Sequence, residues 1–183
     1  MSLYYLQGCS EATADYQCIG CPSPSLAVVR GVILLHESVN MVDVSNLATW
    51  QTAIENGLAI VIPKTSGNYD GGTPNYGTGK GDVAQKYVSS TFKAQYNDDN
   101  YNAANMTAYN AIRNNTVWRF CWRNEKYMYI SDKAATIVAK DPHENDYTKN
   151  VEFVVDVEFT QVDNPIPHPI PTGLFSCVMA IAV

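Results

Sequence analysis

The sequence predicts a mainly β protein: an antiparallel β-sandwich or barrel with one flanking α-helix, one short helix, and extended N- and C-terminal arms. Several segments alternate apolar and polar residues with the period of two that a half-buried strand requires. Only 16% of the residues are charged, while twelve are tyrosine, a composition more typical of extended β proteins than of helical enzymes. The 183 residues suffice for one such domain.

Composition divides the chain into three parts. We expect an N-terminal arm with a cysteine cluster at residues 1–27, the β-sandwich or barrel domain at 28–163, and a proline-rich arm with a terminal strand at 164–183. Residues 65–82 are polar and glycine-rich, so we expect a long loop there. Leu6–Cys9 resembles a lipoprotein box but lacks the preceding basic and apolar regions, so we expect no signal peptide and no membrane anchor.

The domain begins with two apolar strands around a short helix. Val28–His36 and Leu58–Pro63 are apolar runs of strand length, rich in β-branched residues. Between them, Ser45 is the expected helix N-cap and Gly57 the expected stop. The apolar positions with helical spacing are Leu47, Trp50 and Ile54.

The middle of the domain predicts a strand, a second helix and a hairpin. Lys86–Tyr96 alternates as a half-buried strand, and the polar run Asn97–Asn100 ends it and offers a helix cap. The helix carries an apolar stripe of Ala104, Met106, Ala108, Tyr109 and Ile112. Val117–Arg123 and Tyr127–Ser131 then predict a hairpin, and Ala135–Ala139 a short strand.

The clearest strand is Val151–Gln161. One of its faces is apolar, and the other carries Glu152, Asp156 and Glu158. We expect one face in the core and one acidic face. Beyond it, four prolines at every second position in residues 165–171 favour an extended arm, and Gly173–Val183 predicts a buried terminal strand.

The motifs of common chemistries are incomplete. The Gly79-Lys80 pair has Pro74 where a phosphate-binding loop needs glycine, and Gly81 where it needs Ser or Thr. None of the three histidines has a nucleophile or a carboxylate at a sequence spacing that indicates a catalytic site. We therefore predict no enzyme activity and no cofactor.

Two groups of residues are candidate metal ligands. Cys18 and Cys21 have the CxxC spacing of zinc knuckles, with Cys9 as a third candidate ligand and His36 as a distant fourth. We favour three small side chains that pack an N-terminal arm and predict no metal site, because a zinc site typically shows a second CxxC or a paired histidine. The acidic groups Asp98 and Asp99, or Asp141, Glu144 and Asp146, offer calcium ligands but do not fit EF-hand spacing, so we favour turns and a helix cap.

The order of elements resembles that of bacteriophage tail tube proteins and the related tubes of contractile injection systems. The resemblance covers residues 44–163. It rests on the helix ending in ENG, the strand LAIVIPKT, the glycine-rich segment, the strand VSSTFKAQYNDD, the helix NAANMTAYNAIRNN, the hairpin WRFCWRNEKYMYI and the strand VEFVVDVEFTQVD. The N-terminal cysteines and the C-terminal proline-rich arm have no counterpart in that pattern.

The resemblance implies a virion protein, made in the host bacterial cytoplasm, that assembles into rings, commonly of six, stacked as a hollow tube. Its partners would be copies of itself and other virion proteins, with DNA as passing cargo. We expect the lumen to be lined by Glu152, Asp156 and Glu158, because an acidic wall repels phosphate. We expect the loop to conform to a neighbouring subunit through Gly71, Gly72, Gly77, Gly79 and Gly81.

Three alternatives remain open at this stage. One is another virion role, such as a tail-completion, adaptor or decoration protein. A second is a secreted β-sandwich that binds glycan or protein, with tyrosines as contacts; these are Tyr69, Tyr76, Tyr127 and Tyr129. A sugar platform of Trp118, Phe120 and Trp122 belongs with it, although we favour core positions for these three. The third is an enzyme without local motifs.

Overall fold

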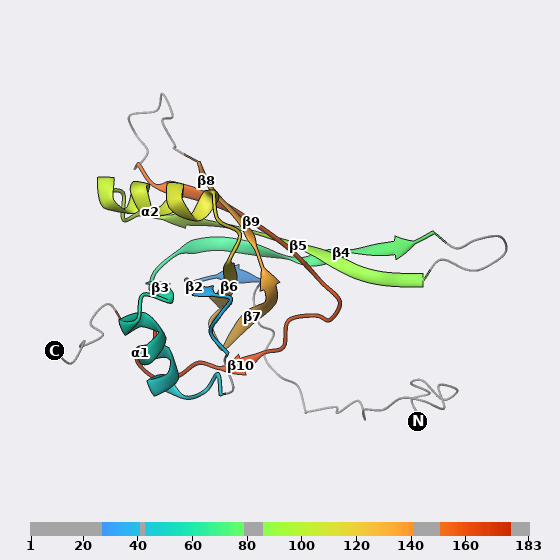
Figure 1. Cartoon of the computed structure of the whole chain (residues 1–183), viewed down its shortest axis with the longest axis horizontal. Coiled ribbons are helices and arrows are strands. Elements are labelled where there is room, and N and C mark those ends of the chain that lie inside the picture. The colour runs from blue at the N-terminus through green and yellow to red at the C-terminus, as the bar shows by residue number, and fades with distance from the viewer. Residues whose placement is uncertain (1–26, 41–42, 79–85, 141–150, 177–183) are drawn as a thin grey trace.

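The computed structural model describes residues 27–40, 43–78, 86–140 and 151–176. Ten strands form two antiparallel sheets of five that pack face to face (Figure 1). Sheet A has the order β1-β4-β5-β9-β8 and sheet B the order β10-β7-β6-β2-β3. The strands of sheet A are β1 (Val28–Val29), β4 (Ser66–Gly77), β5 (Lys86–Asp98), β9 (Phe153–Gln161) and β8 (Thr136–Lys140). Those of sheet B are β10 (His168–Pro169), β7 (Tyr127–Ala134), β6 (Trp118–Arg123), β2 (Gly31–His36) and β3 (Ala59–Ile62). The predicted antiparallel β-sandwich with few helices is confirmed.

The alternating strands place their apolar rows between the two sheets. In β9 the residues at every second position from Phe153 to Gln161 are buried, and β5 does the same from Ser90 to Asp98. The two strands pair in register, with Phe92 opposite Phe159. Aromatic side chains stack on one another in this core. The ring centroids of Phe92 and Phe159 lie 5.2 Å apart, and those of Phe120 and Trp122 lie 5.0 Å apart. The predicted inward rows of β5, β6 and β9 are therefore confirmed.

The outer face of sheet B is covered by the short helix and by the C-terminal arm. Helix α1 (Leu47–Glu55) buries Trp50 and Ala53 against the same cluster that contains Leu174 of the arm. The helix ends at Glu55 with Asn56 as its C-cap, and the predicted stop Gly57 follows with φ of 68°. The predicted N-cap is wrong by one residue: Asn46 accepts the hydrogen bond from the Ala48 amide.

Helix α2 (Ala103–Arg113) closes one end of the core against sheet A. Tyr109 and Ile112 are buried, and Asn102 caps the helix through the Asn105 amide. Ala104 and Ala108 of the predicted stripe are exposed, because the helix lies over the sheet end with only its Tyr109 side turned inward. Sequence periodicity therefore predicted this helix but made its buried face too wide.

The predicted strand Val28–His36 is two strands in different sheets. Val28 and Val29 pair with β4 in sheet A, while residues from Gly31 onward pair with β6 and β3 in sheet B. Thr65 holds the crossover, since its hydroxyl donates to the Val29 carbonyl and its amide to the Arg30 carbonyl. The break depends on these tertiary hydrogen bonds, which an uninterrupted apolar run does not reveal.

The predicted loop at 65–82 is wrong for most of its length, because Ser66–Gly77 is strand β4, paired with β5. Two irregularities interrupt the pairing, and Gly72 sits in the first of them with φ of 97°. A side chain at Gly67 would lie 2.2 Å from the Gln95 carbonyl oxygen. Glycine thus allows a close approach and a bulge here, and Pro74 is tolerated because this stretch of β4 lies at a sheet edge.

The described part of the C-terminal arm runs along sheet B. His168 and Pro169 form β10, paired with β7. Gly173–Phe175 is a turn, with φ of 89° at Gly173, so the predicted terminal strand at Gly173–Val183 is wrong at its start. Its remaining residues, like most of the N-terminal arm at 1–27, lie outside the described part of the chain.

Candidate functional site

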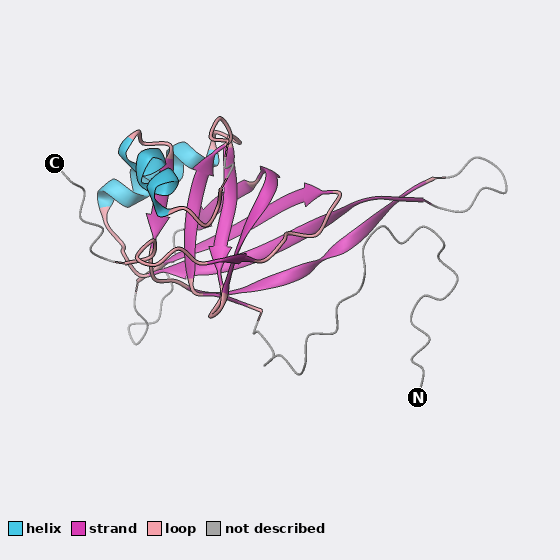
Figure 2. Cartoon of the chain, turned by 90° about the horizontal axis from the view of Figure 1, so that it is seen from below, coloured by secondary structure: helices cyan, strands magenta, loops and turns pink. Residues whose placement is uncertain are grey.

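The most prominent feature of the molecule is the hairpin of β4 and β5, which extends beyond the sandwich (Figures 1 and 2). Pairing of β5 with β9 begins at Ser90, so Lys86–Ser89 pair with β4 alone. On the other side, β1 accompanies β4 only at Gly67 and Asn68, and Asp70–Gly77 have no neighbour on that edge among the described residues. We call residues 73–77 and 86–89 the hairpin stem. Its unpaired edges are templates for strand addition.

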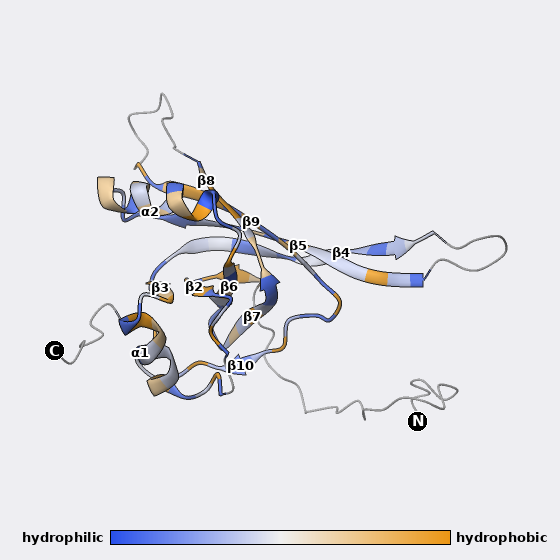
Figure 3. Cartoon of the chain, viewed as in Figure 1, coloured by the Kyte–Doolittle hydropathy of each residue, from blue (hydrophilic) through white to orange (hydrophobic). Residues whose placement is uncertain are grey.

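The hairpin stem exposes large apolar side chains. Tyr76 is 58% exposed and Val88 is 54% exposed. Tyr76 and Tyr87 are cross-strand partners in edge contact, so they share a face of the ribbon, whereas Val88 points to the opposite face. Figure 3 shows a short hydrophobic stretch near the start of β5. Apolar groups on both faces of a projecting ribbon indicate a contact surface.

The glycines predicted for an assembly loop divide between this hairpin and the undescribed tip. Gly71, Gly72 and Gly77 belong to β4. Gly79 and Gly81 lie outside the described residues. The glycines that the structure places are therefore part of a paired ribbon and not of a loop.

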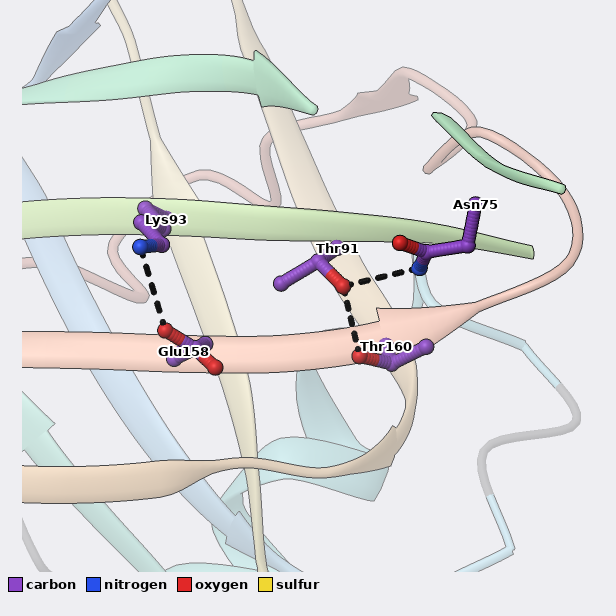
Figure 4. Close-up of polar contacts among 5 residues, drawn as sticks. All are labelled: Asn75, Thr91, Lys93, Glu158 and Thr160. Atoms are coloured by element: carbon purple, nitrogen blue, oxygen red, sulfur yellow. Dashed lines mark hydrogen bonds and ion pairs between the residues drawn. The ribbon is translucent and has the colours of Figure 1, made fainter. Parts of the chain in front are cut away.

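The outer face of sheet A carries a polar network across β4, β5 and β9. The Asn75 amide donates to the Thr91 hydroxyl at 2.9 Å, and Thr91 and Thr160 share a hydrogen bond of 3.1 Å (Figure 4). One step along the strands, Lys93 Nζ lies 3.5 Å from the Glu158 carboxylate. These side chains are exposed or half-buried, so this part of the face is hydrophilic.

The three predicted lumen residues lie together on this outer face, and each has a partner. Glu152 accepts a hydrogen bond from Asn97, and Glu158 pairs with Lys93. Asp156 pairs with Lys140 and accepts a hydrogen bond from Gln95 at 2.8 Å. The Lys140 and Gln95 hydrogen bonds hold the pKa of Asp156 below its usual range. The face is thus acidic but partly neutralised, which the sequence did not show.

We expect Asp156→Asn to lower the free energy of unfolding by less than about 1 kcal/mol at neutral pH, because the pair with Lys140 is solvent-exposed. A lowered pKa in the folded state stabilises the fold above the ordinary aspartate pKa, and this stabilisation disappears as pH falls through the folded value. The difference between wild type and variant should therefore begin to shrink at about pH 4 and vanish only when pH lies below the folded pKa of Asp156. Urea unfolding at several pH values measures it, with exposed Asp163→Asn as control. A difference that persists at low pH would contradict this role.

The aromatic residues weighed for sugar binding are mostly in the core. Phe120 and Trp122 are buried, and Trp118 is half-buried with its ring against His36. Tyr69 and Tyr129 are not free surface groups, because both are half-buried against Trp122, at centroid distances of 4.6 and 5.3 Å. Tyr76 and Tyr127 are exposed.

The candidate metal ligands are not brought together among the described residues. Cys9, Cys18, Cys21 and the acidic group Asp141, Glu144 and Asp146 lie outside them. Within the described ranges no three His, Cys, Asp or Glu side chains could jointly hold a metal ion. His36 hydrogen-bonds Ser38. Cys121 is a free buried thiol, and its burial raises its pKa to about 12.

Asp98 is a buried structural carboxylate. It is 4% exposed and accepts hydrogen bonds from the Tyr109 hydroxyl at 2.8 Å and from the Asn100 amide at 3.0 Å. These donors compensate the loss of hydration. Asp98 therefore anchors the turn before α2, in agreement with the predicted turn and helix cap, and Asn102 provides the cap itself.

A comparison of the chain with protein-family models, curated proteins and solved structures found no match. Neither helix of the described part of the chain has the length and apolar character to cross a membrane.

Proposed function

We propose that this chain is a structural virion protein that assembles into rings stacked as a phage tail tube, through which DNA passes. The observation that carries the proposal is the β4–β5 hairpin. It leaves the sandwich with free edges and exposed apolar side chains, and such a surface is stable in water when a neighbouring molecule covers it. Copies of the same chain are the partners that the resemblance implies.

The two faces of the sandwich suit different sides of a ring. Sheet B is covered on its outer face by α1 and the C-terminal arm, whereas sheet A presents hydrogen-bonded polar side chains. The edges of sheet A are formed by β8 on one side and, on the other, by the two residues of β1 and the outer edge of β4 beyond them, which has no strand partner among the described residues. Side-by-side subunits can therefore join their A sheets edge to edge, with the polar faces turned toward a common lumen.

The charge of this face supports a conduit for DNA. Its carboxylates outnumber its ammonium groups: Asp70, Glu152, Asp156 and Glu158 stand against Lys93 and Lys140. A weakly acidic wall repels phosphate. Among the described residues of this face, Lys93 and Lys140 are both paired with carboxylates, so neither is an isolated cation that could hold the polymer. DNA would slide along such a wall without binding to it.

The orientation of sheet A can be tested with two single cysteine variants. Thr160→Cys lies on the exposed face of sheet A, and Thr52→Cys lies on the exposed side of α1. After assembly, a bulky thiol-reactive polymer should label Thr160→Cys at least tenfold more slowly than Thr52→Cys, while a small maleimide labels both. The wild-type reaction gives the background of native thiols. Equal labelling by the polymer would contradict a lumen at sheet A.

A further inference from the structure

A groove lies between β3 and α2, at the end of the sandwich opposite the hairpin (Figures 1 and 2). Its volume is about 480 Å³. One wall is β3, with Ile60 and Ile62, and the other is α2, with Ala108 and Ile112. β3 is also the last strand of sheet B, so its outer edge has no strand partner among the described residues. The groove is therefore a slot whose two walls carry apolar side chains, with polar and charged groups, among them Asn100, Asn105 and Asp99, in the rest of its lining.

The hairpin stem has the shape that such a slot requires. Its apolar side chains point to both faces of the ribbon: Tyr76 and Tyr87 to one, and Val88 to the other. A flat surface could cover only one of these faces. A slot whose two walls carry apolar side chains covers both faces. It therefore removes apolar area on both sides of the ribbon from water, which is favourable.

The charges of the two surfaces are also complementary. Asp99 and the buried, hydrogen-bonded Asp98 line the groove together with Lys64, so two carboxylates stand against one ammonium group there. The stem carries Lys86, which is exposed, next to Tyr87. Opposite charges at a contact favour the correct register and disfavour wrong pairings.

We propose that the β3–α2 groove receives the hairpin stem of a second copy of this chain. The inference rests on the proposed self-assembly and names its acceptor surface. Donor and acceptor lie at opposite ends of one molecule (Figure 1), so the contact is head-to-tail. Contacts of this kind repeat, and they generate closed rings or open stacks instead of a symmetric dimer.

The test uses one blocking variant for each surface. Ala108→Arg fills the groove from an exposed position of α2, and arginine is a good helix former. Ala111→Arg is the matched control, since Ala111 is an exposed alanine of the same helix outside the groove. Val88→Arg places a charge on the stem. The mass of each protein is measured by light scattering, with the melting temperature as a check of folding.

We expect Ala108→Arg and Val88→Arg each to be a folded monomer, at least tenfold depleted in assemblies, and Ala111→Arg to assemble as wild type does. When mixed, the two blocked variants should form a 1:1 dimer, because each retains the surface that the other lacks. Wild-type assembly that survives Ala108→Arg, or two monomeric variants that form no mixed dimer, would overturn the groove as acceptor. A wild-type chain that never assembles would instead overturn the proposed function.

Discussion

A variant in which residues 75–89 are replaced by an Asn-Gly turn is expected to fold into the same sandwich and to lose self-assembly. Pro74 and Ser90 are cross-strand partners, so a two-residue turn can join them with the twist that a hairpin needs. Ser90 is also the first residue of β5 that pairs with β9. The shortening therefore removes the projecting ribbon and leaves every strand pair of the sandwich.

The expected melting temperature lies within a few degrees of that of the wild type, since the removed side chains contribute little to the core. The assembled fraction should fall at least tenfold. Circular dichroism and light scattering of the same sample measure the two quantities. Assembly at the wild-type level would show that the hairpin is not needed for assembly. Loss of the circular dichroism signal of the folded protein would show that the sandwich depends on the ribbon.

The second large effect is expected from Trp122→Ala. Trp122 is 2% exposed and lies at the centre of an aromatic cluster in which its ring contacts those of Tyr69, Phe120, Tyr129 and Phe159. Removal of a buried Trp side chain leaves a cavity between the sheets and costs about 3–5 kcal/mol. That is a large part of the roughly 5–15 kcal/mol by which a domain is stable.

Urea unfolding followed by circular dichroism measures this loss. Tyr127→Ala is the control, because Tyr127 is an aromatic residue of the adjoining strand that is 42% exposed, and we expect it to change stability by about 0.5 kcal/mol or less. Similar losses in the two variants would contradict the central place of Trp122 in the core.

Strands whose two faces differ were predicted correctly. In β9, apolar Phe153 and Phe159 lie on one face, and Asp156 and Glu158 lie on the other, so the alternation in the sequence indicates which side is buried. β4 has no such alternation. Its glycines and Pro74 suit a loop locally, and its strand conformation is determined by pairing with β5, a partner that local periodicity does not identify.

The sequence predicted only the part of the candidate site that lies on a single strand. The acidic row of β9 was evident in the sequence, but its neutralisation by Lys93 and Lys140 depends on the pairing of β5, β9 and β8. The groove of β3 and α2 joins segments more than forty residues apart, such as Ile60 and Ala108. No local pattern marks such a surface.

The most direct test of self-assembly into a hollow tube is the mass of the purified protein over a concentration series, measured by light scattering, with negative-stain images of the same fractions. The proposed function predicts a mass that rises with concentration, and rings or tubes with a central hole. A single chain at every concentration, with no rings in the images, would contradict it.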